Sequence, residues 1–153
     1  WQYINYLKKL KFEKIENIIL DLKKEINYED NYQEEDCPMS WKELSILNNN
    51  KMTIGSHGLN HLSLTNLSFE DSFLEITESK KMIEENLNIN CKYFSFPFGN
   101  KLDFNEKLVN LCIKSGYEKC FLNQQKYNHV FNRKKTEERI ITFAGKNLKH
   151  ILA

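Results

Sequence analysis

The sequence predicts an α/β fold in which parallel strands alternate with amphipathic helices, as an open sheet or a barrel. Three observations lead to this prediction. Short apolar or aromatic runs at residues 51–56, 91–97 and 117–122 are typical of strands. Longer segments with helical spacing of apolar residues lie between them. The two unusual motifs, "GSHGLNH" and "FPFGN", both fall at the ends of predicted strands, where α/β folds form their sites.

The first third of the chain is predicted to be mainly helical. Apolar residues recur at helical spacing between Ile4 and Ile26. Residues 27–37 are polar and acidic, which is typical of a solvated loop. Ser40-Trp41-Lys42-Glu43 has the capping-box pattern, and it begins a short helix that ends in the three asparagines at 48–50. In that helix Trp41 is predicted to be a packing residue rather than a sugar platform. "KMTIGS" at 51–56 is the first predicted strand.

The middle of the chain predicts a long helix followed by a strand. Ser68-Phe69-Glu70-Asp71 begins the helix, and one apolar stripe is expected to face the core. The members of this stripe are Phe69, Phe73, Ile76, Ile83 and Leu87. The aromatic run "CKYFSFP" predicts a strand that ends at Pro97, because proline has no amide hydrogen for regular pairing.

The last third repeats the alternation of helix and strand. Asp103 and Glu106 are candidate caps of a helix for which Gly116 is the expected stop. Strands are predicted within "YEKCFL" at 117–122 and "RIITFA" at 139–144, and a last short helix is expected after Asn147.

Composition excludes several classes of partner. The formal net charge of +1 provides no broad basic field for nucleic acid, and no apolar run approaches the roughly 20 residues of a membrane span. The N-terminus lacks the pattern of a signal peptide. The four cysteines have no C-x-x-C spacing, so we expect free thiols, which favour a cytoplasmic location and leave a cell-envelope location open.

His57 and His61 form an H-x-x-x-H pair directly after a predicted strand. A strand end followed by a turn can aim two neutral imidazoles at one divalent ion, at about 2.0–2.1 Å from each nitrogen. The spacing alone is a weak signal, because surface or capping histidines show it too. Pro97 and Gly99 have a similar ambiguity, since an ordinary turn after a strand would also contain them.

The neighbouring residues make the histidine pair more informative. "MSWKELSILNNNKMTIGSHGLNHLSLTNLS" resembles the second motif region of polysaccharide deacetylases of the NodB-homology type, carbohydrate esterase family 4. "EITESKKMIEENLNINCKYFSFPFGN" resembles the family's long helix, strand and P-[YF]-G motif. "KLVNLCIKSGYEKCF" and "ERIITF" are similar to later elements, so the resemblance covers roughly residues 38–145.

The resemblance implies part of a distorted (β/α) barrel of the NodB deacetylase type, similar to a TIM barrel. Residues 1–153 would form a single partial domain, with 1–37 as a helical insertion and acidic loop and 38–153 as the core. It also implies a metal-dependent hydrolase that removes acetyl groups from an N-acetylated amino-sugar polymer or oligomer. His57 and His61 would bind the divalent metal, with zinc as the leading candidate.

The resemblance assigns further roles outside the histidine motif. Pro97, Phe98 and Gly99 would form a wall of the sugar groove, and the Phe98 backbone N–H would stabilise the oxyanion. Arg139 would lie near the catalytic carboxylate, although a structural ion pair explains it equally well.

Several departures from the family pattern affect the expected activity. The family's Thr-Phe-Asp-Asp motif, which supplies the base and a carboxylate ligand, is absent from the sequence. The expectation is that the chain begins after that motif and that residues 1–153 show little deacetylase activity. Ser95 replaces a usual arginine. His150 is a weak candidate for the acid of the family's late motif, and His129 is expected to be a solvent residue.

Two alternatives to the deacetylase remain open at this stage. One is a non-catalytic remnant that keeps the groove and binds carbohydrate. The other is a related metal-dependent amide hydrolase that acts on small cyclic amides.

Overall fold

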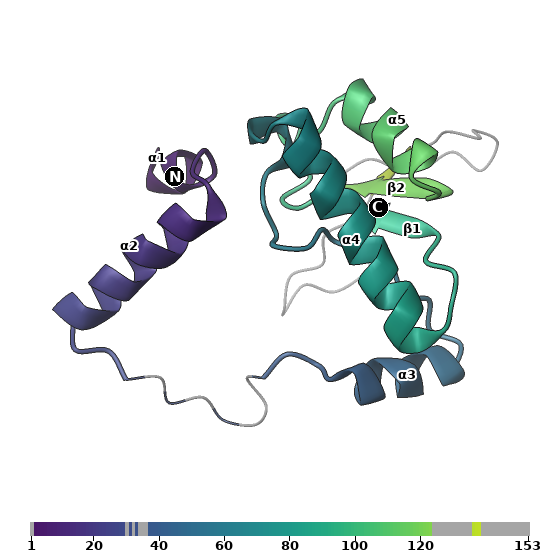
Figure 1. The fold of residues 1–153 in the computed structure, drawn as a ribbon, viewed down its shortest axis with the longest axis horizontal. Helices are drawn as coiled ribbons and strands as arrows, with labels where there is room; N and C mark the ends of the chain where they lie inside the picture. Colours follow the sequence, from purple (N-terminus) through teal and green to yellow (C-terminus); the bar gives the residue numbers. More distant parts are fainter. Residues whose placement is uncertain (1, 30, 32, 34–36, 124–135, 139–153) are drawn as a thin grey trace, which may run out of the picture. The chain divides into compact units, whose positions relative to one another are not determined.

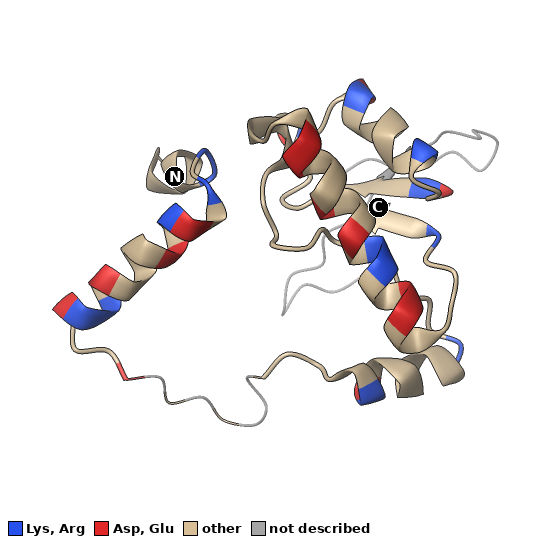
Figure 2. Cartoon of the chain, viewed as in Figure 1, with Lys and Arg blue, Asp and Glu red and all other residues tan. Residues whose placement is uncertain are grey.

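The computed structural model describes residues 2–29, 31, 33, 37–123 and 136–138. The chain separates into two compact units, Trp1–Thr53 and Ile54–Ala153 (Figure 1). The first unit contains helices α1 (Gln2–Leu7), α2 (Phe12–Glu25) and α3 (Trp41–Asn49). The predicted N-terminal helix is therefore two helices, because the backbone at Lys11 is extended between them. Acidic and basic residues are mixed along α2 rather than segregated (Figure 2).

The predicted capping box of α3 is confirmed. The backbone N–H of Glu43 donates to Oγ of Ser40 at 3.3 Å, and the backbone N–H of Ser40 donates to Oε2 of Glu43 at 2.7 Å. These reciprocal bonds satisfy two amides that the first turn of the helix leaves without intrahelical partners.

The second unit is an α/β arrangement around parallel strands. Its elements are η2 (Leu64–Asn66), α4 (Phe69–Leu87), β1 (Tyr93–Ser95), α5 (Glu106–Lys114), β2 (Lys119–Leu122) and β3 (Thr136–Glu138). The described strands form one sheet in the order β1-β2-β3, and both pairings are parallel. Because α5 connects β1 to β2, this segment is a βαβ unit. The α/β prediction with parallel strands is thus confirmed. The strand predicted at 139–144 and the short helix predicted after Asn147 lie outside the described residues.

The predicted strand at 51–56 is only partly correct. Ser56 alone pairs with the sheet, through a parallel bridge to Phe94. Its N–H donates to the Tyr93 carbonyl and its carbonyl accepts from the Ser95 N–H, each at 2.8 Å. The start of the segment belongs instead to the end of α3, because the Met52 N–H donates to the Leu47 carbonyl. The single bridge nevertheless places residue 57 at the carboxyl end of the sheet.

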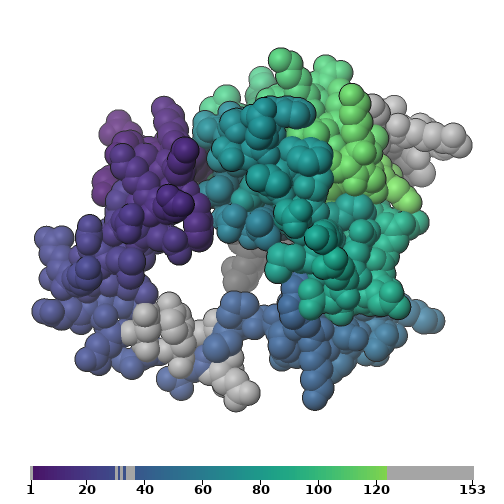
Figure 3. All heavy atoms as spheres, in the orientation of Figure 1, coloured from purple at the N-terminus to yellow at the C-terminus, as the bar shows by residue number. Residues whose placement is uncertain are grey.

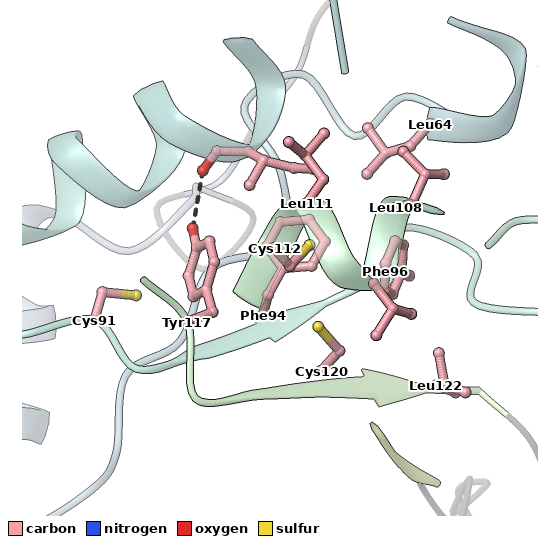
Figure 4. Packing of buried hydrophobic residues seen from close by; sticks show 12 residues of the cluster. Leu64, Cys91, Phe94, Phe96, Leu108, Leu111, Cys112, Tyr117, Cys120 and Leu122 are labelled. Carbon is pink, nitrogen blue, oxygen red and sulfur yellow. Dashed lines mark hydrogen bonds between the residues drawn. The ribbon is translucent and has the colours of Figure 1, made fainter. Parts of the chain in front are cut away.

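The core lies between the sheet and helices α4 and α5 (Figure 4). Phe94 is fully buried, and its ring centroid lies 5.2 Å from those of Phe96 and Tyr117. The Tyr117 hydroxyl donates to the Ile76 carbonyl of α4 at 3.0 Å, so the polar end of this buried ring has a partner. Burial of these rings provides much of the hydrophobic stabilisation of the unit.

The predicted apolar stripe of α4 is partly wrong. Ile76 and Ile83 pack in or against the core as expected, but Phe69 and Phe73 are 67% and 44% exposed. The buried residues of α4 are instead Ser72, Glu75, Ile76 and Ser79. The small serines allow the helix to lie close to its neighbours and bond to them, Ser72 to the Leu64 carbonyl and Ser79 to Ser56. In the space-filling view α4 and α5 form one continuous packed surface (Figure 3).

The ends of α5 are partly as predicted. Gly116 has a φ of 90° and follows the last turn, which confirms it as the stop. The cap, however, is Asn105, whose side chain accepts from the Leu108 N–H at 2.9 Å. Asp103 does not cap the helix, because its carboxylate is buried in the preceding loop.

Within the described residues no helix has both the length and the apolar character needed to cross a bilayer.

Candidate functional site

The first histidine of the motif is fixed by the sheet. His57 follows the bridge residue Ser56, and its Nδ1 lies 2.7 Å from the carbonyl oxygen of Ser95 at the end of β1. A carbonyl only accepts, so Nδ1 carries a proton, and in the neutral ring Nε2 is the nitrogen with the lone pair. Metal-binding histidines in proteins commonly have this outer hydrogen bond, because it fixes the tautomer and the ring orientation.

The second histidine lies beside the first. The ring centroids of His57 and His61 are 4.8 Å apart, with an angle of 74° between the planes. Two imidazoles that bind one ion at about 2.0–2.1 Å place their ring centres about 5 Å apart, so the observed separation suits a shared ligand. His61 has a φ of 56°, in the left-handed region, so its position depends on what holds the loop.

The Pro97-Phe98-Gly99 motif forms a tight turn against His61. The ring centroids of His61 and Phe98 are 4.9 Å apart, in an edge arrangement. Phe98 has a φ of 61°, and the Gly99 N–H donates to the Pro97 carbonyl at 2.7 Å. A three-residue turn of this hand is rare and strained, and such strain is found mainly where the surrounding structure enforces it.

Asn123, directly after β2, enforces this turn. Its backbone N–H donates to the Gly99 carbonyl at 2.9 Å, and its Nδ2 donates to the Phe98 carbonyl at 3.1 Å. The turn at the end of β1 is therefore tied to the end of the neighbouring strand.

The loop after the turn is fixed to the loop after the histidines. Asp103 accepts from the Asn100 N–H and from the Ser63 hydroxyl, each at 3.2 Å. Thr65 donates to the Leu102 carbonyl at 2.9 Å. The loop that follows the histidines and the loop that follows the P-F-G turn are thus connected by hydrogen bonds.

The structure brings together the histidines and the P-F-G turn, five of the six predicted site residues: His57, His61, Pro97, Phe98 and Gly99. The sixth, Arg139, lies outside the described residues, as do His129 and His150.

Sequence reasoning missed two residues that hold these motifs in place. Asn123 left no recognisable signal, because a polar residue after a strand is common. The second residue is Glu75, whose carboxylate accepts from the backbone N–H groups of Leu59 and Asn60. Its signal was an acidic residue next to Ile76 on the face of α4 that packs inward.

Two imidazoles fit a divalent ion, but they do not complete a site. Among the described residues, no group of three or more histidine, cysteine or acidic side chains is placed to hold a metal.

The described cysteines are free thiols, as predicted. Burial raises the pKa of Cys91, and the hydrogen bond with Cys120 together with burial raises that of Cys112. A cysteine binds metal as the thiolate, so these two thiols are poor ligands.

Removing the Asn123 side chain tests how the turn is held. Asn123→Ala should lower the free energy of unfolding by about 1 kcal/mol and weaken the ring contact between His61 and Phe98, because the bond to the Phe98 carbonyl is lost. Urea denaturation and the nuclear Overhauser effect between the two rings measure these changes. Asn86→Ala, which removes an exposed bond to Met82 on α4, is the control. An unchanged ring contact in Asn123→Ala would contradict the assignment.

Comparison with known proteins identifies a family that the sequence matches. The model of the family described as polysaccharide deacetylase matches residues 3–120. A comparison with curated proteins gives no match.

Two solved structures have a similar fold. The deacetylase PplD of Streptococcus pyogenes, in complex with acetate, has a TM-score of 0.68 and 18% identity over 76% of this chain and 50% of its own. A de-N-acetylase from Aggregatibacter actinomycetemcomitans has a TM-score of 0.59 and 16% identity over 88% of this chain and 69% of its own. The chain thus spans half the length of the first.

Proposed function

The chain belongs to the polysaccharide deacetylase family, and on that premise we propose that it carries the histidine half of a metal site for hydrolysis of N-acetylated amino sugars. One observation carries the proposal: the ring centroids of His57 and His61 lie 4.8 Å apart, and Nδ1 of His57 is held by the Ser95 carbonyl. The reaction is hydrolysis of a carbon–nitrogen bond, with an acetylated amino-sugar polymer or oligomer as the substrate class. The complex of the Streptococcus pyogenes relative with acetate, the product of such a reaction, supports this class.

Each motif has a part in the proposal. His57 and His61 bind a divalent ion, for which we propose zinc, through their unprotonated nitrogens. When bound, such an ion polarises the amide carbonyl and lowers the pKa of a water molecule. Pro97 and Gly99 shape the wall of the sugar groove, and the backbone N–H of Phe98 donates to the oxygen that becomes negative. By the same resemblance, Arg139 would lie near the carboxylate that the family's first motif supplies.

The proposal extends to the architecture. The parallel strands and the likeness in fold to two deacetylases support a distorted (β/α) barrel, with 1–37 as an insertion and 38–153 as core units of one partial domain.

A carbohydrate-binding remnant is the second candidate. The observation that favours it is the lack, among the described side chains, of a third metal ligand near the histidines. With only the described residues, a two-histidine site would bind metal weakly and would lack a carboxylate base. The sugar groove proposed at the P-F-G turn needs neither.

Zinc titration of the 153-residue chain tests the metal half-site. We expect binding that weakens at least tenfold, about 1.4 kcal/mol, in His57→Ala and in His61→Ala, because each variant removes one of two ligands. Isothermal titration calorimetry measures the affinity. His129→Ala is the matched control, since the sequence predicts a solvent residue there. Equal losses in all three variants would contradict the assignment.

Acetate release and sugar binding together separate the deacetylase from the carbohydrate-binding remnant. Acetate release from N-acetylated chito-oligosaccharides by this chain should be low, because no carboxylate base accompanies the two histidines among the described residues. Efficient metal-dependent release would overturn that expectation. Oligosaccharide binding that persists in His57→Ala after removal of metal would favour the remnant.

A further inference from the structure

A buried carboxylate from α4 holds the loop between the two histidines. Glu75 is 5% exposed. Its Oε2 accepts from the backbone N–H groups of Leu59 and Asn60, each at 2.9 Å, and its Oε1 accepts from Nδ2 of Asn60 at 2.6 Å. One side chain thus satisfies three donors on two consecutive residues of the H-x-x-x-H motif.

Glu75 is an acid at a position of the helix that is usually apolar. It lies within α4 on the buried face, next to Ile76, where an apolar residue is the usual choice. Burying a carboxylate is unfavourable unless it is well hydrogen-bonded. The three loop donors supply those bonds, so the loop and the acid depend on each other.

The same carboxylate lies beside Gly58, whose backbone conformation rather than its space disfavours a side chain. A Cβ at Gly58 would lie 3.4 Å from Oε2 of Glu75 and 3.5 Å from Cγ of Pro97. Gly58 has a φ of 84° and His61 a φ of 56°, so the backbone is left-handed on both sides of the two anchored amides. The relative orientation of the histidine rings therefore depends on residues 58–60, which Glu75 fixes.

We propose that Glu75 is a positioning residue for the histidine pair. Its carboxylate holds residues 58–60 in the conformation that keeps the rings of His57 and His61 in contact, with their centroids 4.8 Å apart. It acts through the loop and binds neither metal nor substrate. The consequence for metal affinity rests on the proposed function, whereas the consequence for ring orientation does not.

The test uses Glu75→Ala and Glu75→Gln in the 153-residue chain. In metal-free protein, Glu75→Ala should speed hydrogen exchange of the Leu59 and Asn60 amides at least tenfold and abolish the nuclear Overhauser contact between the histidine rings. Its zinc affinity should fall at least tenfold. Glutamine keeps a carbonyl acceptor, so Glu75→Gln should speed exchange only two- to fivefold, keep the ring contact and lose less than threefold in affinity.

A second acid of α4 provides the matched control. Glu84 accepts from the Cys91 N–H and from Lys80, away from the histidine loop. Glu84→Gln should destabilise the protein without changing amide exchange at 59 and 60, ring contact or zinc affinity.

Three outcomes would overturn the positioning role. The first is a folded Glu75→Ala with unchanged ring contact. The second is an equal loss of ring contact in Glu84→Gln. If Glu75→Ala does not fold, the third is unchanged exchange at residues 59 and 60 in Glu75→Gln. Absence of zinc binding in every variant, with the ring contact still dependent on Glu75, would refute the metal site and leave the positioning role standing.

Discussion

Replacing Gly99 with alanine should lower the free energy of unfolding by about 2–5 kcal/mol, since a backbone penalty and a steric penalty combine. Gly99 has a φ of 65°, a conformation that alanine adopts at a cost of about 1–2 kcal/mol. A Cβ there would also lie 2.8 Å from the backbone nitrogen of Asn123 and 2.9 Å from its Cβ. Backbone cannot move aside as a flexible side chain can, so the bond between Asn123 and the Gly99 carbonyl must break.

Gly116 is the matched control for this prediction. It has a similar left-handed backbone, with a φ of 90°, but its added Cβ would meet only the end of the Lys80 side chain at 3.4 Å. Gly116→Ala should therefore cost only the backbone penalty of about 1–2 kcal/mol. Urea denaturation of both variants gives the comparison. Equal destabilisation of the two variants would mean that the contact between the P-F-G turn and the end of β2 does not contribute to the free energy of unfolding.

The features predicted correctly from sequence are those that short segments determine. The Ser40 capping box, the end of β1 before Pro97 and the stop at Gly116 each depend on chemistry within a few residues. The histidine pair was recognisable for a different reason, because the segment around it resembles a family motif. The position of the first ring depends on a distant contact, with the Ser95 carbonyl. Local rules and the resemblance therefore indicated a candidate site, although they did not describe how its residues are held.

The features missed depend on contacts between distant segments. Periodicity assigned Phe69 to the buried stripe of α4, but close approach of the helix to Leu64 and Ser56 requires the small side chains of Ser72 and Ser79 there. Asp103 has the composition of a helix cap, yet its partners include Ser63, 40 positions earlier. Such pairings have no local signature, so the network behind the motifs emerges only from the fold.

Phe94→Ala should lower the free energy of unfolding by about 3–5 kcal/mol and also weaken the histidine site. Phe94 is fully buried between the rings of Phe96 and Tyr117, so truncation leaves a large cavity. Its neighbours in β1 hold the site, because Ser95 donates to the Ser56 carbonyl and provides the carbonyl that binds His57. Looser packing beneath β1 should therefore reduce zinc affinity as well as stability.

The comparison that isolates burial is Phe69→Ala. Phe69 has the same side chain on α4, but it is 67% exposed, so its removal should change the free energy of unfolding by less than about 0.5 kcal/mol. Urea denaturation and zinc titration of the pair measure both effects. Comparable losses in the two variants would show that Phe69 is covered in the folded protein and that the apolar stripe first predicted for α4 is correct. Phe94→Ala could instead lose much stability and keep its zinc affinity per folded molecule. Packing of the core would then not affect the histidine site, and the support of His57 would come from the loop alone.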